Sequence, residues 1–306
     1  MTDNIFFLGH ISMDSIKNIN GSNYQPGGAA LYSAMAAKTL LDDVNLISII
    51  GDDYEFHDAL QEFPKRYIKI FKMPSTRFVI NYNEQWEAEY VSVGFGAGSR
   101  LSISNIPSEI LGTKSIFHLC PLRPSKVERF VKKIKDLSPD TTISINTWIG
   151  YMKNSKSREI LKKIAGETDF FILNESEAKI LTQTSSVSSA MRLIKAKVVI
   201  ITLGDLGTII KKEKSIQFAP SLNYQPHIVD TTGAGDVWCG SFLAAYRITN
   251  DLMKSVSTAS IVTSIKCSGW NYSKIWKLRF RSVEDTIEYI LGIREGSMQK
   301  RMPEYL

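Results

Sequence analysis

The 306-residue sequence contains little cysteine and little histidine. The three cysteines are odd in number and lack the spacing of metal ligands, which argues against a disulfide framework or a zinc site and favours a reducing compartment. The four histidines are too dispersed to predict a metal centre or a catalytic triad, although His10 falls in a loop of interest below. These residues are Cys120, Cys239 and Cys267, and His10, His57, His118 and His227.

Long hydrophobic runs are also missing. No segment approaches the roughly 20 apolar residues that a membrane helix needs, and the start Met1-Thr2-Asp3-Asn4 lacks the basic-then-apolar layout of a secretory signal. With 43% hydrophobic and 22% charged residues, the composition is that of a globular chain with a large core. We therefore expect a soluble cytoplasmic protein without a membrane partner.

Several nucleotide-binding and nucleic-acid signatures are absent. The chain has no Walker string and no protein-kinase strings, which argues against a P-loop NTPase or a protein kinase. Its net charge is +6, but acidic residues interleave with the basic ones near the C-terminus and no nucleic-acid module accompanies them. We expect no specific nucleic-acid partner, and a modest basic excess suits an enzyme with anionic substrates.

The most informative string is Asp230-Thr231-Thr232-Gly233-Ala234-Gly235-Asp236, which runs into a small and apolar segment with helical spacing. The glycines allow a tight turn, and the amides at the predicted helix N-terminus favour phosphate oxygens. A bare Gly-x-Gly-Asp would also suit an ordinary capped helix. A carboxylate beside a phosphate site, however, suggests phosphoryl transfer to a hydroxyl, with Asp236 as base.

This string and the Gly240-Ser241-Phe242 that follows it resemble the C-terminal signature of the ribokinase-like (PfkB) carbohydrate kinases. Further blocks occur in the family's order. They are Ile5-Phe6-Phe7-Leu8-Gly9-His10 followed by Asp14, Pro26-Gly27-Gly28-Ala29-Ala30, Gly51-Asp52-Asp53, Asn174-Glu175-Ser176-Glu177, and Thr202-Leu203-Gly204-Asp205-Leu206-Gly207.

The resemblance implies ATP as phosphate donor, Mg²⁺ and, in the family, often a monovalent cation. It assigns the anion hole to the amides of Gly233, Ala234 and Gly235, with Asp236 as base. It assigns the acceptor site to Asp14, Gly27, Gly28, Tyr32 and Asn146. The nucleotide site would comprise Asn174, Thr202, Gly204, Gly207 and Ala259. Glu177 would hold magnesium through water, and Asp230 would belong to the loop beside the monovalent cation.

Departures from the family pattern cluster on the acceptor side. Tyr32 stands where many relatives carry asparagine, and Phe56 stands where a glycine usually closes its block. In the middle strand, many relatives have an aspartate in an Asp-x-Asn string. This chain reads Ile143-Ser144-Ile145-Asn146 there and lacks the aspartate. Because the phosphate side is nearly intact, we expect retained phosphoryl transfer to an unusual acceptor.

The chain alternates short β-rich runs with helix-length segments, which predicts a mostly parallel sheet with helices on both faces. We predict strands at 4–8, 44–50, 115–119, 141–145 and 198–202, and helices at 31–41, 125–137 and 155–164. With the resemblance, this gives an α/β fold, a ribokinase-like three-layer sandwich, formed by residues 1–306 as one kinase domain.

Residues 76–93 break this alternation. Phe78, Ile80 and Tyr82 precede a polar turn, and Trp86, Ala88 and Tyr90 follow it, all at period two. This pattern predicts an antiparallel hairpin with one apolar face, either a lid over the acceptor or a plain edge hairpin. The lid assignment follows the resemblance and could include residues 12–25. We expect the glycine-rich 94–98 to form a hinge or turn, and the hairpin edge could pair with a second copy.

The predicted activity is therefore transfer of the terminal phosphate of ATP to a hydroxyl of a small sugar or sugar-like polyol such as inositol. A nucleoside kinase of the same family is the alternative, and it is favoured if Phe95, Trp86 or Trp148 lines the acceptor pocket as a stacking surface. An alternative from another class is a ligand-sensing protein that keeps the fold without turnover. The intact Gly-Ala-Gly-Asp string argues against a sensor, which needs no base at position 236.

Overall fold

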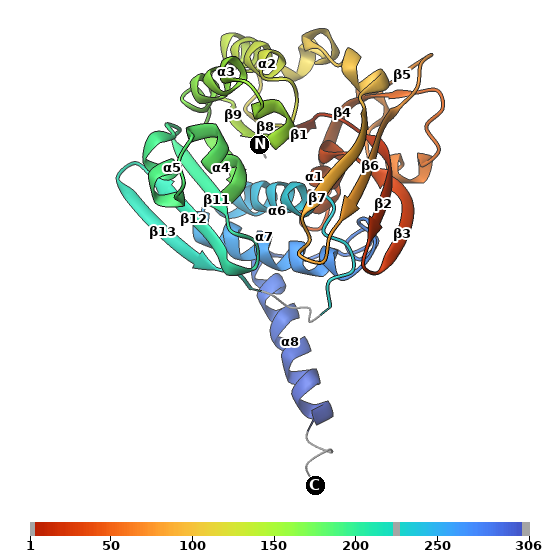
Figure 1. The fold of residues 1–306 in the computed structure, drawn as a ribbon, viewed down its shortest axis with the longest axis vertical. Helices are drawn as coiled ribbons and strands as arrows, with labels where there is room; N and C mark the ends of the chain where they lie inside the picture. Colours follow the sequence, from red (N-terminus) through yellow and green to blue (C-terminus); the bar gives the residue numbers. More distant parts are fainter. Residues whose placement is uncertain (1–3, 223–226, 302–306) are drawn as a thin grey trace.

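The central element of the fold is a sheet of nine strands in the order β13-β12-β11-β10-β9-β8-β1-β4-β5 (Figure 1). The structure is a computed structural model, and it describes residues 4–222 and 227–301. All neighbours from β11 to β5 pair in parallel, and β12 and β13 add an antiparallel edge. The strands are β1 (Asn4–Leu8), β4 (Val44–Gly51), β5 (Ile68–Phe71), β8 (Ser115–Leu119), β9 (Thr142–Asn146), β10 (Phe170–Asn174), β11 (Val198–Thr202), β12 (Gly207–Lys212) and β13 (Ser215–Pro220).

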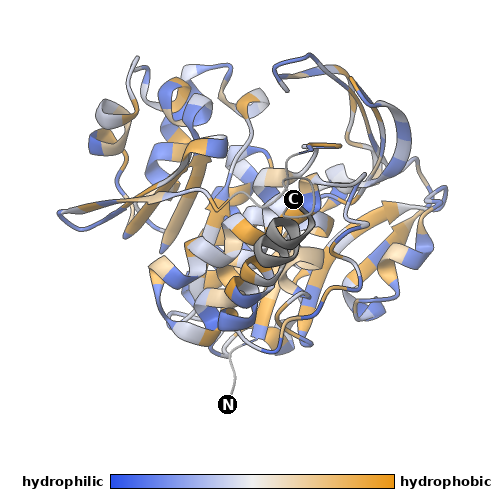
Figure 2. Cartoon of the chain, turned by 90° about the horizontal axis from the view of Figure 1, so that it is seen from below, coloured by the Kyte–Doolittle hydropathy of each residue, from blue (hydrophilic) through white to orange (hydrophobic). Residues whose placement is uncertain are grey.

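Helices cover both faces of this sheet, as parallel strands require of their crossover connections. Strand β1 shows the consequence, because Ile5 and Phe7 join one hydrophobic core and Phe6 and Leu8 join the other. Figure 2 shows the apolar strands lying between the helices. The first core packs against α1 (Ala29–Ala37), α6 (Ala234–Thr249) and α7 (Leu252–Cys267), and the second against α2 (Pro124–Leu137), α3 (Ser155–Ala165), α4 (Glu175–Thr182) and α5 (Val187–Leu193). The predicted three-layer α/β architecture is confirmed.

A second, four-stranded sheet in the order β3-β2-β6-β7 lies to the right in Figure 1. Its strands are β2 (Ser12–Asn18), β3 (Gly21–Gly27), β6 (Thr76–Tyr82) and β7 (Ala88–Gly94). The pairs β2–β3 and β6–β7 are antiparallel, whereas β2 and β6 pair in parallel. The hairpin predicted over 76–93 is therefore present, and residues 12–25 belong to the same small sheet.

Most element boundaries agree with the sequence-based ones, and the differences have local causes. Helix α1 ends at Ala37 instead of residue 41, because the amides of Thr39 and Leu40 donate to carbonyls three residues back and tighten the last turn. The glycine-rich 94–98 segment leads into the short 3₁₀ turn η3 (Gly96–Arg100). The other 3₁₀ turns are η1 (His57–Leu60), η2 (Lys65–Tyr67), η4 (Ile103–Asn105), η5 (Ser108–Ile110), η6 (Ile149–Met152) and η7 (Gly204–Leu206).

The last helix, α8 (Val283–Arg301), extends away from the rest of the molecule in Figure 1. Within residues 4–222 and 227–301, no helix combines the length and the apolar character needed to cross a bilayer.

Candidate active site

Helix α6 begins with the glycine-rich string. Gly233 is its N-cap in the left-handed region (φ 71°), and a Cβ there would lie 2.5 Å from the Tyr32 ring, so only glycine fits. The Ala234 amide donates to the Thr231 carbonyl at 3.0 Å. Among the described residues, the amides of Gly233 and Gly235 have no hydrogen-bond acceptor. The helix N-terminus therefore offers two of the three predicted donors to an anion.

Asp236 lies in the first turn of α6, beside these amides. Asn146, at the end of β9, donates from Nδ2 to Asp236 Oδ1 at 2.9 Å. Burial raises the pKa of Asp236 to about 6, against the opposing effects of the Asn146 hydrogen bond and the Lys266 charge. A carboxyl with this pKa is ionised at neutral pH and basic enough to accept a proton.

A cavity of about 310 Å³ opens in front of Asp236, within the usual size of a small-molecule site, roughly 300–1,000 Å³. Its polar end combines buried atoms that have no hydrogen-bond partner within the described chain, namely His10 Nδ1, Asp14 Oδ1 and Asn146 Oδ1. Its remaining walls are largely aromatic. The aromatic lining residues are Tyr32, Phe78, Tyr82, Tyr90, Phe95, Trp148 and Tyr151.

The aromatic wall combines residues of the β6–β7 hairpin and its C-terminal end with residues that follow β9. Tyr90 of β7 meets Trp148 with ring centroids 4.9 Å apart, and Phe95 stacks on Tyr151 at 6.1 Å. The hairpin therefore contacts residues that follow β9 across the cavity. Trp86, at the hairpin turn, is not part of the lining.

The predicted glycine pair shapes the polar end. A Cβ on Gly27 would lie 1.8 Å from Asp14 Oδ2, so Gly27 makes room for that carboxyl although it does not itself line the cavity. Gly28 caps α1 with φ 98°, and a Cβ there would lie 2.4 Å from the His10 carbonyl oxygen. Burial raises the pKa of Asp14 to about 7 and lowers that of His10 to about 4, so His10 is neutral near pH 7.

Glu177 and Asn174 form a reciprocal cap at the start of α4. The Glu177 amide donates to Asn174 Oδ1 at 2.8 Å, and the Asn174 amide donates to Glu177 Oε2 at 2.9 Å. Both residues line the cavity, and burial together with the Asp236 charge raises the pKa of Glu177 to about 8. No group of three or more His, Cys, Asp or Glu side chains gathers for a metal in residues 4–222 and 227–301. One carboxylate fits Mg²⁺ that keeps most of its waters.

A second cavity, of about 260 Å³, also borders the α6 N-terminus. It is lined by Thr202 at the end of β11, Gly204 in the following turn and Gly207 at the start of β12, three residues that the family resemblance assigns to a nucleotide site. Ala259 does not line it. This residue is fully buried in the core, and its neighbours on α7, Val256, Ser260 and Thr263, face the cavity instead.

The two cavities share residues at the start of α6. Thr202, Thr231, Ala234 and Gly235 line both, so a ligand in either cavity reaches the same amides. This is the geometry that transfer of a group from one ligand to the other requires.

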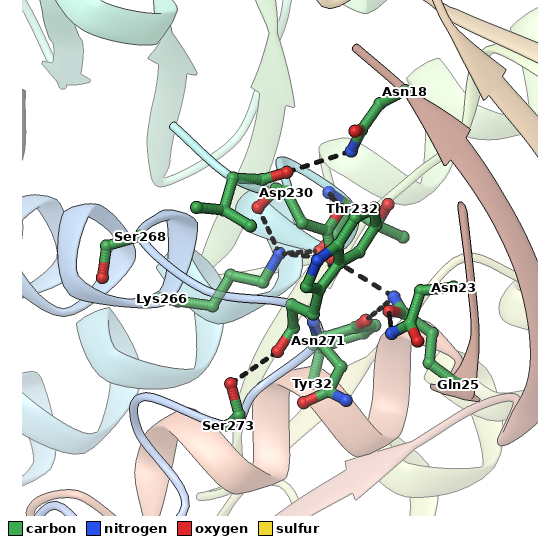
Figure 3. A network of polar contacts seen from close by, with 12 residues as sticks. Asn18, Asn23, Gln25, Tyr32, Asp230, Thr232, Lys266, Ser268, Asn271 and Ser273 are labelled. Carbon is green, nitrogen blue, oxygen red and sulfur yellow. Dashed lines mark hydrogen bonds and ion pairs between the residues drawn. The ribbon is translucent and has the colours of Figure 1, made fainter. Parts of the chain in front are cut away.

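Asp230 lines neither cavity and is completely buried. Its carboxylate accepts hydrogen bonds from the Thr232 amide (2.8 Å), the Asn271 amide (3.0 Å) and Gln25 Nε2 (3.2 Å). The loop that precedes α6 is thereby fixed from several elements (Figure 3).

Comparison with known proteins agrees with this geometry. The model of the pfkB family of carbohydrate kinases matches residues 3–269. The chain belongs to this family. The kinase is 29% identical to a cytidine kinase of Thermococcus kodakarensis over 247 residues, which cover 78% of this chain and 87% of the relative. It is 25% identical to a nucleoside kinase of Methanocaldococcus jannaschii over 291 residues, 86% and 91% of the two chains.

The kinase also shares its fold with a solved double mutant of the fructokinase of Vibrio cholerae O395, in a form with bound fructose, ADP and potassium ion. The TM-score is 0.76 at 18% identity, over 90% of this chain and 95% of the other. The family match ends before α8, and the single-domain assignment of residues 1–306 stays a prediction.

Sequence reasoning brought together most of the residues around the cavity but missed two kinds. The period-two pattern placed Tyr82 and Tyr90 on the apolar face of the hairpin, but it did not predict that these two residues line the cavity. Gln25 and Lys266 carried no signal, because a lysine near a helix C-terminus is ordinary in sequence.

Proposed function

We propose that this protein is an ATP-dependent kinase that phosphorylates a hydroxyl group of a nucleoside, with Asp236 as the general base. One observation carries the proposal. The cavity in front of Asp236 has a buried polar end and aromatic walls, and it meets the second cavity at the α6 N-terminus. A ribose hydroxyl group and an aromatic base match these two surfaces.

In the proposed reaction, Asp14 and Asn146 orient the acceptor, and Asp236 accepts the proton of the attacking hydroxyl group. The amides of Gly233 and Gly235 stabilise the charge that spreads over the transferred phosphoryl oxygens. The nucleotide would lie against Thr202, Gly204 and Gly207, and Glu177 would hold Mg²⁺ through water. Magnesium supplies neutralising charge to the phosphates when it is bound.

The nucleoside class rests on the aromatic walls. Phe95 and Trp148 line the cavity, which is the feature that separates a nucleoside pocket from one for a small polyol. The named activities of the cytidine and nucleoside kinases among the relatives agree with this choice.

A sugar or cyclic polyol such as inositol is the second candidate. The unpartnered atoms of His10, Asp14 and Asn146 could bind any vicinal hydroxyl groups, and the fructokinase neighbour was solved with fructose. This candidate leaves the aromatic walls without a ligand group to contact.

The decisive experiment measures ADP release with ATP and Mg²⁺ against nucleosides, sugars and inositols. We expect release with nucleosides, and Asp236→Asn should lower turnover by at least about 10²–10⁴-fold while ATP affinity is kept. Sugar-dependent release alone would support the second candidate. Acceptor binding without ADP release would overturn the proposed function and favour a sensor. An equally active Asp236→Asn variant would overturn the assignment of Asp236 as the base.

Aromatic variants test the acceptor class separately. Phe95→Ala and Trp148→Ala should raise KM for the nucleoside about tenfold or more, because base stacking contributes about 1–3 kcal/mol. Trp86→Ala is the matched control, since Trp86 does not line the cavity. Unchanged KM values in both cavity variants would contradict base stacking.

A further inference from the structure

The side chain of Lys266, in the last turn of α7, is completely buried beneath the anion-binding loop. Its ammonium group donates to the main-chain carbonyl oxygens of Asp230 at 2.7 Å and Thr232 at 2.5 Å. It also lies 3.4 Å from Asp230 Oδ2 and 5.5 Å from the centre of the Tyr32 ring. Figure 3 shows the lysine directed at these oxygens.

A buried charge of this kind is costly unless each of its hydrogens finds an acceptor. Lys266 has three ammonium hydrogens, and two carbonyls and a carboxylate surround them. Asp230 is equally buried and supplies the compensating charge. The group of acceptors is an oxygen cage with a ring face on one side, and that chemistry suits a single positive charge.

The family resemblance implies a monovalent cation beside Asp230, and the oxygens of this cage are the groups that would have to bind it. These oxygens would suit such an ion, but the Lys266 ammonium already uses both carbonyls and approaches the carboxylate. A metal cation at this place would meet a positive charge in a buried site. The residues of this chain therefore do not fit a bound monovalent cation.

We propose that Lys266 takes the place of that cation, so that phosphoryl transfer needs no potassium and Lys266 acts as a positioning residue for the anion hole. The inference rests on the proposed kinase function of the same site. In this proposal, the positive charge of the Lys266 side chain holds the loop before α6 in place without a bound ion.

The link to the anion hole follows from peptide geometry. The Thr232 carbonyl and the Gly233 amide belong to one planar trans peptide and point in opposite directions. When the carbonyl is held toward Lys266, the Gly233 amide is directed away from it, and Gly233 lines the acceptor cavity. Loss of the ammonium would free this peptide to rotate.

The first experiment uses the wild-type protein. Initial rates are measured in potassium, sodium and tetramethylammonium chloride at equal ionic strength. We expect kcat/KM to agree within about twofold, since removal of an anion-hole donor would otherwise cost about 10²–10³-fold. A rise of tenfold or more in potassium would overturn the proposal.

Two variants test the role of the lysine directly. Lys266→Met keeps the length of the stem without the charge and should lower kcat by about 10²-fold or more, with little change in KM for the acceptor. Lys266→Ala leaves space, and potassium, ammonium or methylammonium should restore a large part of its kcat. Lys254→Met is the control, because Lys254 lies on the same helix and forms an exposed ion pair with Glu284.

Full turnover in Lys266→Met, or a folded Lys266→Ala that no cation rescues, would contradict the proposal. A melting experiment separates this result from a failure of the proposed function. Even without any phosphorylation, potassium should raise the melting temperature of Lys266→Ala and leave that of the wild type unchanged relative to tetramethylammonium. Equal responses of the two proteins would overturn the inference.

Discussion

At the residue scale, Asp236 is placed between opposing influences. The helix N-terminus and the Asn146 hydrogen bond favour its charged form, whereas burial favours the neutral form and raises its pKa to about 6. At neutral pH the carboxyl group is therefore mostly ionised and able to accept a proton. Besides burial, its pKa depends on neighbours from two other elements, namely Asn146 of β9 and Lys266 of α7, which both lower it.

A pH profile checks this balance. Since Asp236 must be ionised to accept a proton, kcat/KM should fall about tenfold per pH unit below its pKa. Asn146→Ala removes a hydrogen bond to the charged form, so the acid limb should move to higher pH. Other titratable groups near Asp236, among them Glu177, Tyr90, Cys120 and Cys239, stay the same in this comparison. An unshifted limb would exclude Asp236 as the titrating base.

Gly27 offers a second test at this scale. Gly27→Ala places a Cβ where the Asp14 carboxylate lies, so Asp14 must move. We expect KM for the acceptor to rise about tenfold while KM for ATP is kept, because a lost hydrogen bond to a charged group costs about 1.5–3 kcal/mol. Gly292→Ala is the control, as no atom lies within 4 Å of its added Cβ. Equal KM values in the two variants would show that Asp14 does not bind the acceptor.

At the scale of elements, the β6–β7 hairpin reaches across the cavity to the segment after β9. The contact between Tyr90 and Trp148 joins the small sheet to this segment. Arg77, near the start of β6, pairs with Asp53 at 2.8 Å and fixes the base of the hairpin to the loop after β4. The role of the hairpin as a lid stays a prediction, as does the pairing of two copies along β7.

The lid prediction is tested at Tyr90. Tyr90→Ala should weaken closure, raise KM for the acceptor and increase ATP hydrolysis in the absence of acceptor, because closure excludes water. Val91→Ala is the matched control, since Val91 is the next residue on the strand and is 56% exposed. Unchanged hydrolysis and KM in Tyr90→Ala would indicate an edge hairpin without a closing role.

At the scale of the whole molecule, buried ionisable groups around the cavity tie stability to pH. The pKa values of Asp14 and Glu177 are raised to about 7 and 8. The folded chain therefore binds more protons than the unfolded chain over this range, and its unfolding free energy falls as the pH rises through both values. His10 and His118, with pKa values lowered to about 4 and 3, act in the opposite direction below pH 6.5.

Urea unfolding at pH 6.5 and pH 8 measures this effect. We expect the free energy of unfolding to fall by about 1–2 kcal/mol for each raised carboxyl group. Glu177→Gln keeps an acceptor for the Asn174 amide but cannot titrate, so its loss of stability should be smaller. Identical pH dependence in the two proteins would contradict the raised pKa of Glu177.

The sequence by itself determined what depends on neighbouring residues. The strand at 4–8 and the glycine turn before α6 are local features, so their patterns could be read along the chain. Only the tertiary structure decided which residues meet. Asn146 reaches Asp236 across 90 positions, and Lys266 reaches the Asp230 carbonyl across 36. Ala259 faces the core instead of the second cavity, because residues along a helix point in directions that repeat every 3.6 residues and the packing of α7 decides which direction faces the cavity. Such contacts depend on the packing of whole elements, which no local pattern encodes.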